Sequence, residues 1–172
     1  MQEVGPGDLW LGPVRCPADD GPAFVVGSGG DQLLLEVDGI RLRGSDAGEE
    51  LIRWRELLGL RITAPVLTGV LGWAVNLVAM LSPVDAAGLP YVVVVAQTLR
   101  ERTEFDLGSP SDGRYSMKEA RALDALVELL TSEGQLELLG RPGWLRGLLL
   151  DSGLPMAVPS PRGIAKLVRA RI

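Results

Sequence analysis

The sequence predicts an α+β protein of antiparallel strands, forming a partly open barrel or a sandwich of roughly six to eight strands with helices on the C-terminal side. Three observations lead to this prediction. Apolar and polar residues alternate between Gln32 and Ile62, a pattern typical of half-buried strands. The chain contains 22 glycines and 12 prolines, which indicates many turns. Charged amphipathic helical patterns begin only after residue 115.

The first predicted strands are short. Leu9–Leu11 is predicted as a strand that ends at Gly12 and Pro13, because these residues favour turns over sheet interiors. Residues 16–22 hold two prolines, two aspartates and a glycine, and we predict a loop there. Phe24–Val26 is aromatic and β-branched, so it is predicted to form the next strand.

A hairpin is the best-defined feature of the first half. Gln32–Val37 and Gly39–Gly44 surround an Asp-Gly pair at positions 38 and 39. Asp-Gly favours a two-residue hairpin turn, because both central residues then need positive φ. Alternate residues of the first strand are predicted to face the core: Leu33, Leu35 and Val37. Two further strands are predicted to continue the antiparallel order: Leu51–Arg55 and Leu57–Ile62.

Residues 62–84 contain no charged side chain. The interpretation that we prefer is a buried helix over Val66–Leu81, because apolar residues recur there at helical spacing. A pair of strands is an alternative. A transmembrane helix is another, since about twenty apolar residues can cross a bilayer. Pro65 and Pro83 flank the segment, and a cluster of positively charged flanking residues is missing, so the membrane-spanning interpretation is the weaker one.

Two strands precede the main helix. Tyr91–Gln97 is largely β-branched, as in strands at the centre of a sheet, and Thr103–Leu107 is predicted to return beside it. Ser116 and Glu119 form a capping box, in which the hydroxyl and the carboxylate each satisfy a backbone N–H at the start of a helix. The predicted helix carries an apolar stripe: Ala120, Leu123, Leu126, Val127 and Leu130.

The last part of the chain is predicted to be helical, with one extended break. We predict a short helical piece over Gln135–Leu139 and a helix over Pro142–Leu150, because proline suits a first helical turn. Three prolines favour an extended linker over Leu154–Arg162. Gly163–Ile172 can then form a short amphipathic helix.

Charge divides the chain near the same linker. Residues 1–155 carry 13 basic and 22 acidic side chains, whereas residues 156–172 carry four basic and no acidic ones. We therefore predict one domain over residues 1–153, followed by a proline-rich linker and a basic amphipathic tail over residues 154–172. The net charge of −5 argues against nucleic-acid binding, which needs a basic face.

The chain lacks the residues that most enzymes and metal sites use. It contains no histidine, the commonest general base and metal ligand. The single cysteine, Cys16, cannot form an internal disulfide or a cysteine-based zinc site, and we interpret it as an incidental thiol. We predict no cofactor and no metal. The sequence does not begin with a basic and apolar leader, so we expect a cytoplasmic protein, with a membrane-peripheral location as the alternative.

Other polar residues are better interpreted as structural. Ser28 lies in a glycine-rich stretch that precedes a strand and lacks the lysine of a phosphate-binding loop, so we predict a turn. Asp19 and Asp20 are adjacent in a polar loop, whereas a pair of catalytic carboxylates must face each other across a cleft. Ser116 lacks a histidine that would activate it and serves as a helix cap.

Two sets of residues are candidates for binding. Arg41 and Arg43 share one strand face, and Arg53 and Arg55 share another, so the four can form an anion-binding patch. The alternative is an ordinary solvated sheet face. The basic tail can contact an anionic membrane, a protein partner or a second copy of the chain, or it can fold back on the domain. Its candidate contact residues are Ile164, Lys166, Leu167, Val168, Arg169 and Arg171.

The hairpin and the strands after it resemble those of bacterial PH-like domain proteins. The stretches that carry the resemblance are DGIRLRG at residues 38–44 and IRWRELLGLRI at residues 52–62. In that family a similar hairpin precedes a strand with the pattern I-x-W-x-E-L/I-x-x-L, and a helix closes the domain. The resemblance covers roughly residues 24–131, and the apolar insert and the helices after residue 134 depart from it. It implies a PH-like fold that binds membranes, peptides or proteins, without catalytic residues.

These observations favour binding over catalysis. We expect a non-catalytic binding or scaffolding module that acts through protein–protein contact, with a protein partner or with itself. A peripheral membrane protein that uses the basic tail is the second hypothesis. An enzyme without histidine chemistry is the third.

Overall fold

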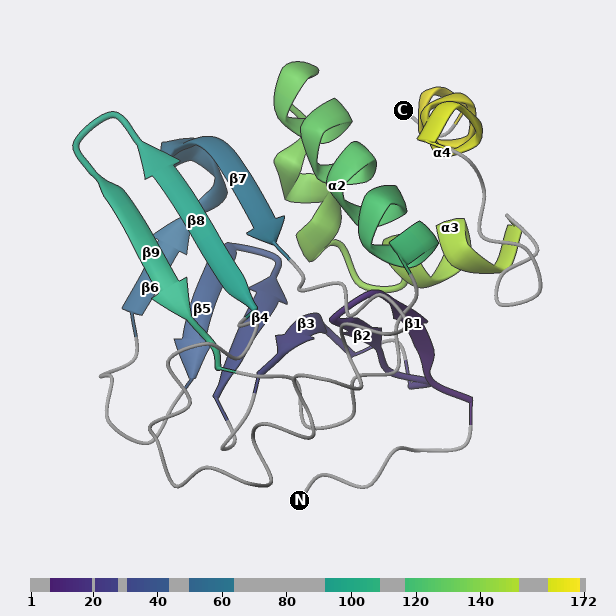
Figure 1. Ribbon diagram of the computed structural model, residues 1–172, viewed down its shortest axis with the longest axis horizontal. Helices are drawn as coiled ribbons and strands as arrows, with labels where there is room; N and C mark the ends of the chain where they lie inside the picture. Colours follow the sequence, from purple (N-terminus) through teal and green to yellow (C-terminus); the bar gives the residue numbers. More distant parts are fainter. Residues whose placement is uncertain are drawn as a thin grey trace, which may run out of the picture.

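The strands form two antiparallel sheets in the computed structural model, and helices pack beside them (Figure 1). The α+β class with antiparallel strands is thereby confirmed, and the sheets formed by the described strands do not close into a barrel. The part of the chain that the structure describes holds six strands in one sheet and three in the other, against the six to eight predicted in all. The described residues are 7–19, 21–27, 31–43, 50–63, 92–108, 117–151 and 161–170.

The six-stranded sheet follows chain order, and each strand is antiparallel to the next. The sequence predicts only one strand before residue 23. Gly12, with φ of 58°, and Pro13 do end that strand, but the chain then returns beside it as a second strand. The strands are β1 (Leu9–Leu11), β2 (Val14–Cys16), β3 (Ala23–Val26), β4 (Gln32–Glu36), β5 (Gly39–Arg43) and β6 (Glu50–Arg53).

The predicted β4–β5 hairpin is present, but its turn lies one residue earlier than predicted. Glu36 pairs with Gly39, so the two loop residues are Val37 and Asp38. Gly39 is needed for a different reason, because a Cβ at this position would lie 2.1 Å from the carbonyl oxygen of Ile52 on β6. Val37 is 62% exposed and not part of the core. The other two residues that were predicted to face the core from this strand, Leu33 and Leu35, are buried.

The predicted strand over Leu51–Arg55 ends early, at Arg53, and a 3₁₀ turn, η1 (Trp54–Glu56), follows it. The indole Nε1 of Trp54 donates a hydrogen bond to the Glu36 carbonyl at 2.7 Å. Its backbone N–H donates to the Asp38 carbonyl. These bonds to the β4–β5 hairpin turn the chain at Trp54 and bury its ring, which starts the next strand in a new direction.

The three-stranded sheet consists of β7 (Leu57–Thr63), β8 (Val93–Thr98) and β9 (Arg102–Asp106), in that order. One face is apolar, with Ile62, Val94 and Phe105 in one cross-strand row. Polar side chains dominate the other face, where Arg61 and Glu104 flank Val95. This alternation confirms the two strands predicted after residue 90, with ends shifted by one or two residues.

The main helix, α2 (Met117–Ser132), packs against β7 beside the three-stranded sheet (Figure 1). Most of its predicted apolar stripe is buried, and Gly134, with φ of 65°, follows its end, as is common after helices. The 3₁₀ helix η2 (Leu136–Gly140) and α3 (Trp144–Asp151) follow where short helices were predicted. Ser116, the predicted cap of α2, lies outside the described residues.

The last helix, α4 (Pro161–Arg169), packs on α2. Val168 is fully buried, and Nε of Arg169 lies 3.1 Å from Oε1 of Glu133. The extended linker was predicted to reach Arg162, but the helix already begins at Pro161, a position that proline suits. The tail helix is therefore folded against the domain.

The predicted apolar helix at Val66–Leu81 lies outside the described residues. Among the helices that the structure describes, none combines the length and the hydropathy that crossing a bilayer requires. The inward faces of both sheets and the buried sides of the helices form one hydrophobic core. The opposite face of the six-stranded sheet is consequently the one turned away from this core.

Candidate functional site

One row of side chains crosses all six strands of the larger sheet on the face away from the core. The register pairs each member with the next, from β1 to β6. Opposed residues in an antiparallel sheet lie on the same face, so the six side chains form a continuous stripe of alternating aromatic, aliphatic and cationic groups. This outward row consists of Trp10, Arg15, Phe24, Leu34, Arg41 and Leu51.

Arg15 connects the aromatic members of the outward row. Its guanidinium carbon lies 5.4 Å from the centroid of the Phe24 ring and 5.8 Å from that of the Trp10 ring, within the range of cation–π attraction. Phe24 is 8% exposed, whereas Trp10 is 37% exposed. A mostly buried aromatic cluster with a cation at its centre therefore occupies the β1–β3 end of the row, and Trp10 is its exposed member.

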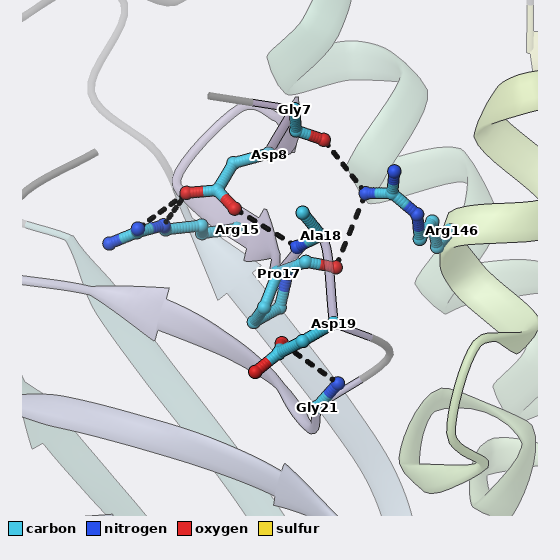
Figure 2. Close-up of polar contacts among 8 residues, drawn as sticks. All are labelled: Gly7, Asp8, Arg15, Pro17, Ala18, Asp19, Gly21 and Arg146. Atoms are coloured by element: carbon cyan, nitrogen blue, oxygen red, sulfur yellow. Dashed lines mark hydrogen bonds and ion pairs between the residues drawn. The ribbon is translucent and has the colours of Figure 1, made fainter. Parts of the chain in front are cut away.

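Asp8 fixes the position of Arg15 (Figure 2). The carboxylate accepts hydrogen bonds from Nε and Nη2 of Arg15, and Nε lies 2.8 Å from Oδ2. The other oxygen of Asp8 accepts a bond from the Ala18 N–H at 3.0 Å. Arg15 is thus held by the ion pair on one side and by the two rings on the other.

Arg146 of α3 fastens the same hairpin to the helical side (Figure 2). Its Nη1 donates to the carbonyl oxygen of Gly7 at 2.9 Å and to that of Pro17 at 3.2 Å. Gly7 precedes β1 and Pro17 follows β2, so both carbonyl groups lie at the open end of the β1–β2 hairpin. The aromatic end of the outward row is therefore positioned by contacts from a helix distant in sequence.

The predicted arginine patch is assembled in part. Arg41 belongs to the outward row, and its Nε lies 2.9 Å from Oε2 of Glu36. Arg43 pairs with Gln32, and Arg53 pairs with Gly39. Both arginines lie on this face, one on each side of the row. Both are exposed, and neither has an ion-pair partner among the described residues.

Arg55, the fourth member of the predicted patch, is exposed in the 3₁₀ turn and does not share a strand face with Arg53. The prediction that these two arginines share a face is wrong, because the strand ends at Arg53. Three of the four predicted arginines thus lie together on the sheet.

The tail residues are placed by α4. Val168 is buried against α2, Leu167 packs partly against the core, and Arg169 pairs with Glu133. Lys166 is exposed. Arg171 and the side chain of Ile164 lie outside what the structure describes. A contact of the tail with a partner or a membrane stays a prediction, and only a contact through Val168 would require that residue to leave α2.

Cys16 lies beside the site but turns into the core, where it is 2% exposed. Burial raises the pKa of its thiol to about 12 despite the opposing effect of Arg146, and Asp8 adds to the rise. The cavity next to it, lined by Pro17 and Arg146 among others, encloses about 10 Å³, room for roughly one water molecule. A thiolate nucleophile is therefore disfavoured at this position.

No group of three or more metal-binding side chains occurs within the described ranges. Comparison with known proteins found no match to a family model, to a curated protein or to a solved structure.

Sequence reasoning missed the aromatic end of the outward row. Arg15 and Phe24 were not connected with Trp10, because β2 was not recognised. The signal was present in Gly12 and Pro13, since a tight turn there brings Trp10 opposite Arg15. Asp8 offered no comparable pattern, because its role depends on the folded hairpin.

Proposed function

We propose that this protein is a non-catalytic binding or scaffolding module, a PH-like arrangement of strands closed by a helix, that holds a protein partner against the outward row. The observation that carries the proposal is the register of the six-stranded sheet. It gathers Arg41, Arg43 and Arg53 on the face that also carries the half-buried side chains of Leu34 and Leu51.

The composition of this face supports contact with a protein. Aromatic residues and arginine are enriched at protein interfaces, where they provide much of the binding energy. The row offers Trp10 on β1, which is partly exposed, and the half-buried aliphatic side chains of Leu34 on β4 and Leu51 on β6. A partner that covers the row would bury these apolar groups and retain the arginines at the rim.

Charge indicates the kind of partner. The whole chain carries a net charge of −5, yet the outward row and its two flanking arginines carry four cations. Glu36 and Asp8 compensate two of these cations, Arg41 and Arg15. Arg43 and Arg53 remain for carboxylates of a partner, and such complementary charges speed association and select the partner.

The proposal can be tested by cross-linking in the cells that naturally make this chain. A photoreactive amino acid at position 43 would report on the outward face, and the same amino acid at position 128 would report on the exposed side of α2. We expect a defined cross-linked protein from position 43 alone, and its yield should fall when Arg53→Glu is added. Equal cross-linking from both positions, or from position 128 alone, would contradict the proposal.

A further inference from the structure

The outer edge of the three-stranded sheet carries a charge pattern that is complementary to itself. Among the strands that the structure describes, β9 forms this edge, on the side of β8 away from α2 (Figure 1). Its solvent-facing residues are Arg102, Glu104 and Asp106, and Arg100 precedes them in the hairpin loop. Read along the chain, these four exposed side chains are two cations followed by two anions. A strand with this order can pair with an antiparallel copy of itself.

The hydrogen bonds of β9 show which backbone groups point away from β8. The carbonyl oxygen of Glu101 accepts a bond from Thr98 of the β8 end, and the N–H of Leu107 donates to Val92, which precedes β8. In an antiparallel pair, residues bonded to the neighbour alternate with residues whose polar groups point outward. The outward groups of β9 therefore belong to Arg102, Glu104 and Asp106, the residues that also carry the exposed charges.

Only one antiparallel register pairs residues with outward backbone groups and also places opposite charges across from each other. With a two-fold axis at Thr103, Arg102 of each copy lies opposite Glu104 of the other, and both residues have outward backbone groups. The same register directs Arg100 toward Asp106 of the second copy. An axis at Glu104 would instead place two glutamates face to face, and an axis at Phe105 would oppose Glu104 with Asp106. Like charges directly opposite each other destabilise a strand pair.

We infer that β9 pairs with the β9 strand of a second copy about Thr103, so that two three-stranded sheets join into one continuous sheet. Arg102 and Glu104 form two symmetry-related ion pairs across the joint, and their backbones form the new hydrogen bonds. A two-fold interface of this kind is complementary to itself by construction. The inference is independent of the proposed partner contact, which uses the other sheet.

The turn of the hairpin lies at the rim of this contact. Leu99 is 85% exposed at the β8–β9 turn, and the register with the axis at Thr103 places it beyond the end of the second copy's strand. Edge strands that must stay single are usually protected by charges that repel or by proline. In β9 the two cations instead precede the two anions, so an antiparallel copy of the strand places opposite charges face to face. Because the strand is short, we expect a weak dimer.

Charge reversal provides the test. The molar mass of the full chain would be measured by sedimentation equilibrium across a concentration series. Arg102→Glu and Glu104→Arg each turn both ion pairs into repulsive pairs, so each variant alone should dissociate at least about tenfold more readily than the wild-type chain. The double variant R102E/E104R restores opposite charges and should return the dimer.

Mixing the two single variants gives the sharpest result. A chain with Arg102→Glu carries two anions at the joint, and a chain with Glu104→Arg carries two cations, so together they should form a heterodimer although neither dimerises alone. Heterodimer formation also shows that both variants are folded. A monomeric wild-type chain, or variants that neither lose nor regain the dimer in this way, would overturn the inference.

Two controls exclude simpler causes. Arg61→Glu reverses a charge on the same sheet face but on β7, two strands from the edge, and should leave the dimer intact. The variant R43E/R53E, which tests the partner contact on the other sheet, should also dimerise normally. Loss of the dimer in either control would indicate an effect of total charge or another interface, and would contradict pairing through β9.

Discussion

Asp8 and Arg15 form an ion pair across the β1–β2 hairpin, with Arg15 Nε 2.8 Å from Asp8 Oδ2 and the Asp8 side chain only 4% exposed. The pair holds the guanidinium near both aromatic rings of the outward row. Removing one partner of a buried pair leaves the other charge uncompensated. We therefore expect Asp8→Ala to lower the free energy of unfolding by about 3 kcal/mol, as measured by urea denaturation.

A nearby aspartate provides the control for this prediction. Asp19 is exposed and accepts one hydrogen bond, from the N–H of Gly21 (Figure 2). Asp19→Ala should therefore cost less than about 1 kcal/mol. Equal costs for the two substitutions would show that the Asp8–Arg15 pair does not stabilise the hairpin.

Cys16 should make stability fall at alkaline pH. Because the folded-state pKa is about 12 against 9.0 for the unfolded thiol, the unfolded chain loses its proton first. Between pH 9 and 12 the wild-type chain should thus lose stability relative to Cys16→Ala, by about 1.4 kcal/mol per pH unit. Urea unfolding of both proteins across this range measures the difference, and parallel curves would contradict burial of the thiol.

Two glycines should respond differently to alanine. At Gly39 the new Cβ would lie 2.1 Å from the Ile52 carbonyl oxygen, a backbone atom that can move only with β6. Gly39→Ala should therefore cost more than about 2 kcal/mol. At Gly134 nothing lies within 4 Å of the Cβ position, and the only cost is the positive φ, about 1 kcal/mol. Thermal unfolding would rank them, and the reverse order would contradict the β5–β6 register.

The docked tail depends on Val168 rather than on its ion pair. Val168 is fully buried, whereas the Arg169 side chain is 67% exposed where it meets Glu133. Val168→Asp should release α4, so its amides should exchange with solvent much faster than in the wild-type chain. Arg169→Ala should change exchange little, since exposed ion pairs contribute about 0–1 kcal/mol. Equal exchange in the two variants would show that Val168 does not hold the helix.

The sequence predicts local features of this fold better than those that depend on distant contacts. The β4–β5 hairpin and the stripe of α2 are visible because periodicity and turn residues act over a few positions. The true turn of the hairpin was missed by one residue, because Gly39 is required by the approach of Ile52 and not by a positive φ. The early end of β6 was missed for a similar reason, since the bond from Trp54 to Glu36 joins residues 18 positions apart.

The same distinction applies to the candidate sites. Arg41, Arg43 and Arg53 could be chosen from the sequence because alternate residues of a strand share a face. The row that joins them to Trp10 and Arg15 could not, because it depends on the register of five strand pairs. The charge order of β9 is readable in the sequence, but its meaning requires knowing that β9 lies at an edge.

The most direct test of the binding proposal is an affinity measurement on the partner that cross-links from position 43. Binding of the purified partner to R43E/R53E would be compared with binding to K118E/R121E, which makes the same change in net charge on the exposed side of α2. We predict a loss of affinity of about tenfold or more for the first variant and near wild-type binding for the second. Equal affinities for the two variants would show that the partner does not bind the outward face of the six-stranded sheet.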